Sequence, residues 1–266
     1  MLRYGWINED FIIIYAIVID NTYIVSLGGG WHVGCYTTRG VVMVLPTYQA
    51  PVLMVDGVVL QLIDDRLHVL LIQRANEPFR GMYALPGGYI VAGETTHFSL
   101  ARILAQKADI KVENLAIIEQ LYTFDTIARD PRGHAISVTY MGLGYQLTFG
   151  GQPDAHNPCF VAVDELPELA YDHAEIIAYA HDRLKSKINY TNVVFALLPK
   201  RFTLTQLQSA YEAILQRQLD KRNFRKKFLS LDTITPTNEY FRDGAHRPAQ
   251  LYEFTAQRLT NFAKDF

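Results

Sequence analysis

One stretch of this chain, from Gly88 to Ile110, constrains the fold more than any other part of the sequence. It reads GYIVAGETTHFSLARILAQKADI, a glycine-bearing loop followed by a helical pattern. Apolar residues recur there at the spacing of one helix face: Phe98, Ala101, Leu104, Ala105 and Ala108. Glu94 precedes this stripe and Arg102 lies within it. The stretch therefore predicts a loop and an amphipathic helix that packs on a larger body.

The separations in this stretch resemble the Nudix box, G-x5-E-x7-R-E-U-x-E-E-x-G-U, in which U is an apolar residue. Gly88, Glu94 and Arg102 fall at the required positions, and Leu104 and Ile110 fill the two apolar slots. The frame of the box is therefore present in this sequence.

The helix positions at which the box carries carboxylates hold Ile103, Gln106 and Lys107, and the closing glycine is replaced by Asp109. A Nudix enzyme cuts a diphosphate by holding divalent cations against it, and such cations need several carboxylate oxygens. Positions 103, 106 and 107 are expected to share one helix face aimed at the substrate. An alkyl group, an amide and an ammonium cannot hold a cation there. We therefore expect no catalytic and no metal-binding residues, and hydrolysis is in doubt.

Charge is distributed unevenly along the chain. Residues 200–266 contain 12 Lys and Arg against 7 Asp and Glu, a net charge of +5, whereas residues 1–199 contain 13 against 20, a net charge of −7. This asymmetry predicts an acidic N-terminal body and a basic C-terminal module. Overall, 49% of the residues are hydrophobic and 20% are charged, as in soluble globular proteins.

Cysteine usage and hydropathy exclude several classes of protein. Cys35 and Cys159 are too few for a disulfide framework or a zinc site, which favours a cytoplasmic location. The apolar run Phe11–Ile19 is too short to span a bilayer, and acidic residues precede it where an export signal carries positive charge. We expect no membrane segment.

Residues 1–48 are interpreted as an N-terminal extension. Phe11–Ile19 and Tyr23–Leu27 are β-rich runs that predict a hairpin, and Gly28–Gly30 is a loop without the helix that a phosphate loop needs. One hypothesis is that translation begins at Met43. N-terminal mass spectrometry of the natively expressed protein tests it, since an intact Met1 peptide rules it out.

Residues 49–190 are predicted to form an α/β/α sandwich around the Gly88–Ile110 stretch. A polar turn, Arg129–Gly133, separates two of its expected strands. Asp172 is expected to cap a last helix that runs to about Leu184, with Glu175 at the capping-box position. Asp172 and His173 are interpreted as helix-start structure rather than as catalytic groups. The expected strands are Leu53–Ile63, Leu67–Gln73, Glu113–Tyr122, Ala135–Leu143 and Pro158–Val163.

Residues 191–266 are predicted to form a second domain, after a polar connector from Lys185 to Thr191. Thr203 is an expected N-cap of its first helix, with Gln206 at the capping-box position. A second helix starts at Asp220 and has the sequence DKRNFRKKFLSL.

This second helix has one apolar and one basic face. At helical spacing, Phe224, Phe228 and Leu231 lie within roughly 60° of one another, and Arg222, Asn223 and Lys226 lie opposite. Arginine can read guanine, asparagine can read adenine, and lysine neutralises phosphate. The alternative is that the basic residues form an ordinary solvated face.

The residues after this helix favour the nucleic-acid interpretation. Thr233–Thr235 and Gln250–Phe254 are expected strands, and between them Asp243-Gly244 predicts a turn that Arg242 and Arg247 flank. A helix, a turn, a basic helix and a hairpin with arginines at its tip form a winged helix-turn-helix arrangement. Such a wing can contact phosphates or the minor groove while the helix enters the major groove.

Residues from about 51 to 255 resemble the NrtR family of Nudix-related transcriptional regulators. The motifs that carry the resemblance are ALPGGYI, EQLYTF, RDPRG and LAYDHAEII in the first domain and FTLTQLQSAYEAIL, DKRNFRKKFL and HRPAQLYEF in the second. The resemblance implies a bacterial, cytoplasmic homodimer that binds a palindromic double-stranded DNA operator and represses genes of NAD synthesis or salvage. It also implies that the Nudix domain senses ADP-ribose or a related nucleotide, without a required cofactor, and that this effector releases DNA.

The resemblance and the residue chemistry together give two sets of candidate site residues. Arginines pair well with a diphosphate and aromatic rings can stack on adenine. The effector-binding candidates are Arg74, Phe79, Glu94, Arg129, Arg132 and Tyr140. The DNA-binding candidates are Thr203, Thr205, Lys221, Arg222, Asn223, Arg225, Lys226, Arg242 and Arg247.

Several of these residues have structural alternatives. Arg129 and Arg132 could fasten a surface turn, Tyr140 could belong to the core, and Glu94 could pair with Lys107 or Arg102 and contact no ligand.

Two alternative functions also fit the sequence. One is an ADP-ribose pyrophosphatase that uses Glu94, Glu119 and the substrate phosphates to hold Mg²⁺. The other is a Nudix-fold regulator that responds to a sugar.

Overall fold

The structure, a computed structural model, describes residues 15–19, 22–26, 34–36, 50–149, 157–242 and 248–263. Contacts divide the chain after Ala50 into two units. The first unit is an antiparallel sheet of β1 (Tyr15–Ile19), β2 (Thr22–Ser26) and β3 (Gly34–Tyr36). The pairing of β1 with β2 confirms the predicted hairpin within these bounds. Gly28–Gly30 and Met43 lie outside the described residues.

The second unit is built on a mixed sheet with the strand order β10-β5-β4-β9-β8. Strand β4 is parallel to β9 and antiparallel to β5. The short strands β6 and β7 pair antiparallel with β5 and β4, respectively. Each long strand overlaps a predicted one, although β8 starts later than expected because Val112–Asn114 forms a short 3-10 helix, η1. The strands are β4 (Val52–Ile63), β5 (Arg66–Gln73), β6 (Tyr83–Ala84), β7 (Gly87–Tyr89), β8 (Ile117–Phe124), β9 (Ala135–Leu143) and β10 (Cys159–Ala162).

Helix α1 (Thr96–Ala108) is the helix of the degenerate box. The Thr95 hydroxyl caps it by accepting a hydrogen bond from the Phe98 N–H group at 3.2 Å. It ends at Asp109, whose φ of 50° is left-handed. Aspartate tolerates this conformation better than most residues, which explains how it can stand where the box has glycine.

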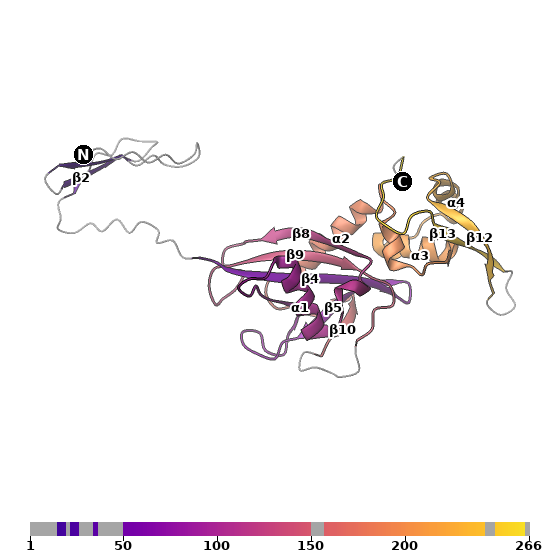
Figure 1. Cartoon of the computed structure of the whole chain (residues 1–266), viewed down its shortest axis with the longest axis horizontal. Coiled ribbons are helices and arrows are strands. Elements are labelled where there is room, and N and C mark those ends of the chain that lie inside the picture. Colours follow the sequence, from indigo (N-terminus) through magenta and orange to yellow (C-terminus); the bar gives the residue numbers. More distant parts are fainter. Residues whose placement is uncertain are drawn as a thin grey trace. The chain divides into compact units, whose positions relative to one another are not determined.

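The sheet lies between two helices (Figure 1). Side chains alternate along β4, so that Val55 and Val59 pack with α1 whereas Val58 and Leu60 pack with helix α2 (His173–Lys187). This arrangement confirms the predicted α/β/α sandwich. Helix α2 continues past the predicted end near Leu184.

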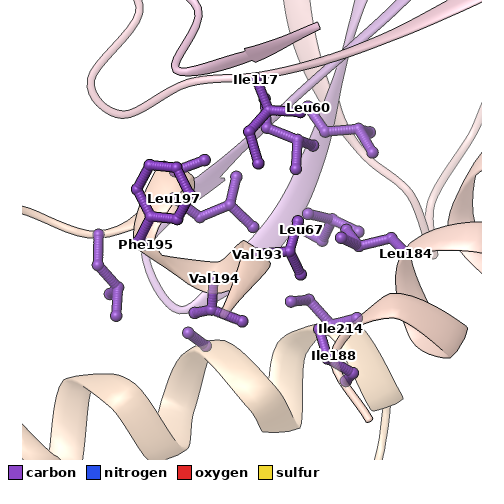
Figure 2. Packing of buried hydrophobic residues seen from close by; sticks show 14 of the residues in the cluster. Leu60, Leu67, Ile117, Leu184, Ile188, Val193, Val194, Phe195, Leu197 and Ile214 are labelled. Carbon is purple, nitrogen blue, oxygen red and sulfur yellow. The ribbon is translucent and has the colours of Figure 1, made fainter. Parts of the chain in front are cut away.

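The core on the α2 face continues into the C-terminal part of the chain. Figure 2 shows Leu67 of β5, Leu184 of α2 and Ile214 gathered around Val193. The segment Lys185–Thr191, expected to be a polar connector, is a packed junction instead, because apolar side chains on both of its sides belong to one cluster.

Hydrogen bonds join the same parts of the second unit. His181 Nε2 lies 2.7 Å from the Ile214 carbonyl oxygen, and the Tyr211 hydroxyl donates to the Ile188 carbonyl at 3.3 Å. All four residues are buried. Helix α2 is therefore bonded and packed to the C-terminal helices along its second half.

The C-terminal part is a winged helix domain, as the sequence predicts. Thr203 and Gln206 form the predicted capping box at the start of its first helix. The sheet order is β11-β13-β12, and β12 extends well beyond the predicted Thr233–Thr235. Asp243-Gly244 and Arg247 lie outside the described residues. The elements are η2 (Val193–Leu197), β11 (Phe202–Thr203), α3 (Leu204–Leu215), α4 (Lys221–Leu229), β12 (Ile234–Phe241) and β13 (Ala249–Phe254).

Candidate functional site

A small polar cavity lies where β4, β5, the end of α1, the β8–β9 loop and the start of α2 meet. Its volume is about 30 Å³, which is enough for one water molecule rather than for a nucleotide. The lining residues are Met54, Asp56, Ile72, Arg74, Leu85, Gly87, Lys107, Arg129, Asp130, Tyr171 and His173.

Arg129 forms the centre of a buried ion-pair network in this cavity. Its Nε and Nη2 atoms donate to the two Asp172 oxygens at 2.8 and 2.7 Å, and Nη2 lies 3.5 Å from Asp56 Oδ2. The Ser137 hydroxyl donates to the same Asp56 oxygen at 2.5 Å. Burial by itself lowers the pKa of Arg129, but the Asp172 and Asp56 carboxylates outweigh it and raise the pKa above its ordinary value. Arg129 therefore stays charged and fixed in place.

This network changes the role predicted for Asp172. Asp172 does precede the first turn of α2, but its side chain accepts no capping hydrogen bond. Both of its oxygens bond to Arg129 instead. The predicted capping box with Glu175 is therefore wrong, because the buried guanidinium is a stronger partner for the carboxylate than a backbone N–H group.

His173 is also part of the cavity wall. Its Nδ1 atom accepts a hydrogen bond from the Leu85 N–H group at 2.8 Å, which assigns the proton to Nε2, 3.9 Å from Asp56 Oδ1. Burial lowers the pKa of His173 below its ordinary value of 6.5, against a smaller opposing effect of Asp56. The side chain is therefore neutral in the folded protein near pH 7.

This burial predicts how stability depends on pH. Below about pH 6.5 the unfolded His173 side chain binds a proton that the folded one resists, so the free energy of unfolding should fall as the pH is lowered from 7.5 to 5. The His173→Gln variant should show a shallower fall, by up to about 1.4 kcal/mol per pH unit. Urea titrations at several pH values measure this. Parallel pH profiles for the two proteins would contradict the assignment.

Gly87 is required by the packing beside Asp56. A Cβ atom at position 87 would lie 1.7 Å from Asp56 Oδ1, so no other residue fits without moving the carboxylate. The carbonyl oxygen of Gly87 accepts a hydrogen bond from Lys107 Nζ at 2.5 Å. Gly87, the first glycine of the PGG motif, thus lets the Asp56 carboxylate and the Lys107 ammonium group both lie against its backbone.

Arg74 and Lys107 are the cations of this cavity that bond to backbone carbonyl groups. Arg74 donates to Pro78 O at 2.7 Å and to Asn76 O at 3.2 Å, and Lys107 donates to Gly87 O. Within the described ranges, neither has a carboxylate within 4.0 Å. Burial lowers the pKa of Lys107, and the Asp56 carboxylate opposes this effect. An anion that binds Arg74 and Lys107 therefore has no ion pair to displace.

An aromatic group borders these cations. The Arg74 guanidinium lies 4.8 Å from the centre of the Tyr171 ring, and Phe79 packs edge-on against the same ring at 4.9 Å. The Arg132 guanidinium lies 5.9 Å from the centre of the Tyr171 ring and 5.7 Å from that of Tyr89. The Tyr171 hydroxyl is buried without a hydrogen-bond partner among the residues that the structure describes. Such an orphaned group is costly unless a ligand or water completes it.

The structure brings together Arg74, Phe79, Arg129 and Arg132 of the candidate effector residues, around Tyr171. Arg129 is buried and Arg132 pairs with Asp130 at 2.6 Å, so both also fasten the turn that carries them. Sequence reasoning missed Tyr171. Its position beside the LAYDH helix start was visible, but its left-handed φ of 58° was not.

Glu94 and Tyr140 do not line the cavity. Arg102 donates to Glu94 through two nitrogen atoms, each at 2.7 Å, and together with Ser99 it holds the pKa of Glu94 down to about 2. Tyr140 is buried, with its hydroxyl 2.6 Å from Thr96 Oγ1. These contacts match the structural alternatives named for both residues.

The residues at the box positions do not fit a divalent cation. Ile103 is buried in the core beneath Gly88, Gln106 is exposed, and only Lys107 lines the cavity. The common face expected for these residues is therefore divided. Glu119 lies 2.7 Å from Lys187 in an ion pair. Across the described residues, no three His, Cys, Asp or Glu side chains gather as a metal site.

A second candidate surface lies on α4. Its Phe224 and Phe228 side chains are buried, whereas Arg222, Asn223 and Lys226 are exposed, as the helical spacing predicts. Asp220 caps the helix by accepting a hydrogen bond from the Asn223 N–H group at 2.8 Å. Lys221 and Arg242 are exposed as well. This face presents several cations and one amide to solvent.

The threonines of the candidate DNA-binding set differ in position. Thr203 is 5% exposed and its hydroxyl is the capping acceptor for Gln206 N, so it has a structural role, and its DNA contact stays a prediction. Thr205 is exposed and its hydroxyl accepts a hydrogen bond from Arg225 Nη2 at 3.4 Å. Arg225 is therefore held across from α3 rather than fully free.

A larger open cleft of about 570 Å³ lies between the β4–β5 turn, the end of β10 and the end of α3. Its charged residues bond mainly to protein groups: Arg66 pairs with Asp164 at 2.7 Å, and Glu212 accepts from the Leu219 N–H group at 2.7 Å. Arg217 of its wall is exposed and forms no ion pair among the described residues, but no second unpaired cation of the wall lies with it, unlike in the small cavity. Within the part of the chain that the structure describes, no helix is long and apolar enough to cross a membrane.

Two family models match the chain. The model described as "NUDIX domain" covers residues 54–180, and the model described as "NrtR DNA-binding winged helix domain" covers residues 194–254. Both domains of the second unit are therefore matched separately.

Individual relatives agree with these models. The chain is 33% identical to the "ADPR responsive transcriptional repressor NtrR" of Acinetobacter baylyi, over 79% of this chain and 84% of that protein. It is 37% identical to an "ADP-ribose pyrophosphatase" of Methanocaldococcus jannaschii, over 49% of this chain and 73% of that protein. The structure of Shewanella oneidensis NrtR complexed with a 27mer DNA matches with a TM-score of 0.68 and 32% identity, over 80% of this chain and 99% of that one. The chain therefore belongs to the NrtR family of transcriptional regulators, in which a Nudix domain is joined to a DNA-binding winged helix domain.

Proposed function

We propose that this protein is a transcriptional repressor that binds operator DNA through α4 and the wing and releases it when ADP-ribose or a related nucleotide binds the Nudix domain. The observation that carries the proposal is the presence, in one packed unit, of an exposed basic α4 face and a cavity with two unpaired cations. The A. baylyi relative is named as an ADPR-responsive repressor, which supports this pairing of signal and output.

The effector is proposed to place its diphosphate against Arg74 and Lys107 and an aromatic base against the Phe79 and Tyr171 group. Arginine and lysine bind phosphate oxygens through charge-assisted hydrogen bonds, and an aromatic ring offers a stacking surface. The unpartnered Tyr171 hydroxyl supplies a further hydrogen bond to the ligand. Since the cavity is only about 30 Å³, the side chains around it must move when a nucleotide binds.

Helix α2 is the proposed connection between the two sites. Its first residue, His173, lines the cavity and its neighbour Asp172 bonds to Arg129. Its second half contacts α3 through His181 and the shared core. A ligand that shifts Tyr171, two residues before His173, therefore acts on the start of a helix whose second half packs against the winged helix domain. The two states must differ in effector affinity for this coupling to exist.

We further propose a homodimer on a palindromic operator, with half-sites one helical turn or a multiple of it apart. A single α4 spans one major-groove segment, so that two copies are needed for a long specific site. The family resemblance suggests that the regulated genes belong to NAD synthesis or salvage and that the protein acts in the cytoplasm.

Electrophoretic mobility-shift assays with DNA from upstream of the protein's own gene test the DNA-binding part of this proposal. We expect specific retardation at an inverted repeat, with an affinity that falls by roughly a thousandfold between about 50 and 200 mM salt if about six phosphates are neutralised. A matched fragment with the repeat scrambled is the control. Equal retardation of both fragments would contradict sequence-specific repression.

The similarity to a pyrophosphatase calls for a hydrolysis assay. We expect no ADP-ribose turnover with Mg²⁺ or Mn²⁺, because Glu94 and Glu119 are both held in ion pairs. Robust turnover that the Glu94→Gln variant abolishes would favour the enzyme instead.

A further inference from the structure

We propose that Lys107, together with Arg74, replaces the divalent cation of the Nudix box, so that the cavity binds a diphosphate without metal. This inference rests on the proposed effector site and specifies its chemistry. At position 107 the Nudix box usually has a carboxylate, which would bind a metal ion. Lys107 instead places a positive charge there, which can bind the diphosphate directly.

The position of Lys107 supports this exchange. It belongs to the last turn of α1, and its Nζ atom reaches the wall of the cavity, where it bonds to the Gly87 carbonyl oxygen. Of the box positions that usually carry carboxylates, it is the one that lines the cavity, since Ile103 is buried and Gln106 is exposed. The ammonium group therefore occupies the place from which a box carboxylate would hold a metal.

The charges in the cavity also support a diphosphate site without metal. Arg129 bonds to Asp172 and Arg132 bonds to Asp130, so those cations already have anionic partners. Arg74 and Lys107 bond to backbone carbonyl groups and have no ion-pair partner among the described residues. A diphosphate diester has one negative charge on each phosphate, which matches these two cations.

The same cations make the cavity unsuitable for a metal. A divalent ion beside Lys107 would meet a like charge, and Asp56, a carboxylate of the same wall, is already bonded to Ser137 and close to Arg129. Glu94 cannot serve as a metal ligand either, because it forms an ion pair with Arg102. A phosphate group gains from the same arrangement, since an ammonium and a guanidinium donate charge-assisted hydrogen bonds to its oxygens.

The hydrogen bonds of the two cations also suit a site that opens. Both side chains are long, and a carbonyl oxygen is a weaker partner than a phosphate oxygen. Moving Lys107 and Arg74 from carbonyl groups to a ligand therefore costs little, while Arg129 remains fixed by two carboxylates. This division explains how a cavity of about 30 Å³ can admit a diphosphate.

Calorimetric titration of the full chain with ADP-ribose, in EDTA and in Mg²⁺, tests the inference. We expect the same dissociation constant in both buffers, within about twofold. Lys107→Met should weaken binding by about tenfold or more in both buffers, as expected for the loss of one charge-assisted contact. Lys111→Met, which removes an exposed charge of the same segment outside the cavity, should bind like the parent protein. Circular dichroism and thermal unfolding verify that each variant is folded.

A charge-reversed variant gives the sharpest contrast. Lys107→Glu restores a box carboxylate, so ADP-ribose binding should become weak in EDTA and should recover in part when Mg²⁺ or Mn²⁺ is added. A parent protein that binds ADP-ribose only in Mg²⁺, or a Lys107→Met variant that binds as tightly as the parent, would overturn the role of Lys107 and leave the proposed effector intact.

Inorganic pyrophosphate separates the two ideas. If ADP-ribose binds in neither buffer but pyrophosphate binds in EDTA and loses affinity in Lys107→Met, the proposed effector is wrong and the metal-free anion site stands. If pyrophosphate and ADP-ribose both fail to bind the folded protein in EDTA, the inference itself is overturned.

Discussion

The double variant Arg222→Ala, Asn223→Ala is expected to lose about a hundredfold or more in affinity for the operator, because each side chain that reads a base edge contributes about 1–3 kcal/mol of discrimination. Both side chains are exposed on α4, opposite the buried Phe224 and Phe228. Alanine keeps the helix, and the Asp220 cap uses the backbone of residue 223, so the fold should persist. Fluorescence anisotropy with operator and scrambled DNA measures the effect.

The control variants distinguish base reading from charge loss. Lys226→Ala should weaken binding to all sequences alike and reduce the slope of log affinity against log salt by about one. Arg217→Ala removes an exposed charge that follows α3 and lines the larger cleft, and should bind as the parent does. An operator affinity of the double variant equal to that of Arg217→Ala would show that α4 does not read the DNA.

The Arg129→Met variant is expected to lower the free energy of unfolding by about 3–5 kcal/mol. It leaves the Asp172 and Asp56 carboxylates in a buried site without the guanidinium that pairs with both. Removing one partner of a buried pair is costly because the remaining charge stays desolvated. Urea unfolding of the full chain at pH 7.5 measures the loss.

Two matched variants separate this effect from a general sensitivity of the loop. Arg132→Met, in the same turn, removes a guanidinium that is 40% exposed from the buried Asp130, which keeps its hydrogen bond from the Arg132 N–H group, so this variant should cost less than Arg129→Met. Adding Asp172→Asn to Arg129→Met should recover part of the stability, since one unpaired carboxylate is then neutral. Equal losses in Arg129→Met and Arg132→Met would mean that the Arg129 network contributes no more than the partly exposed Arg132–Asp130 pair.

The parts of the fold that could be predicted were those set by local patterns. Alternation of apolar residues predicted β9 from Ala135 to Leu143 as the structure has it, and helical spacing separated Phe224 and Phe228 from Arg222 and Lys226. The capping box of Thr203 was also visible, because it depends on residues three positions apart. These features need no knowledge of distant contacts.

The cavity could be predicted only in part. Arginine and aromatic residues near the box indicated an anion site, and Arg74, Phe79, Arg129 and Arg132 do gather around Tyr171. Which of these side chains are buried, and which carboxylates they pair with, could not be read from the sequence. It depends on pairs that lie far apart in the chain.

The misassigned roles have the same physical origin. Asp172 looked like a helix cap because its short-range pattern fits one, but Arg129, far away in the sequence, takes both of its oxygens. The Lys185–Thr191 segment has a polar sequence and lies between the two matched domains, but Ile188 within it is buried in the core that α2 shares with the winged helix domain. In each case a contact between distant segments outweighed the local preference.

The most direct test of the proposed coupling is a titration of ADP-ribose into labelled operator DNA bound to the full chain, followed by fluorescence anisotropy in EDTA. A repressor with the proposed coupling should release the DNA, and bound operator should weaken ADP-ribose binding by the same factor, since coupling between sites is reciprocal. Anisotropy that stays at the value of the bound complex, at ADP-ribose concentrations that calorimetry shows to saturate the protein, would contradict the account.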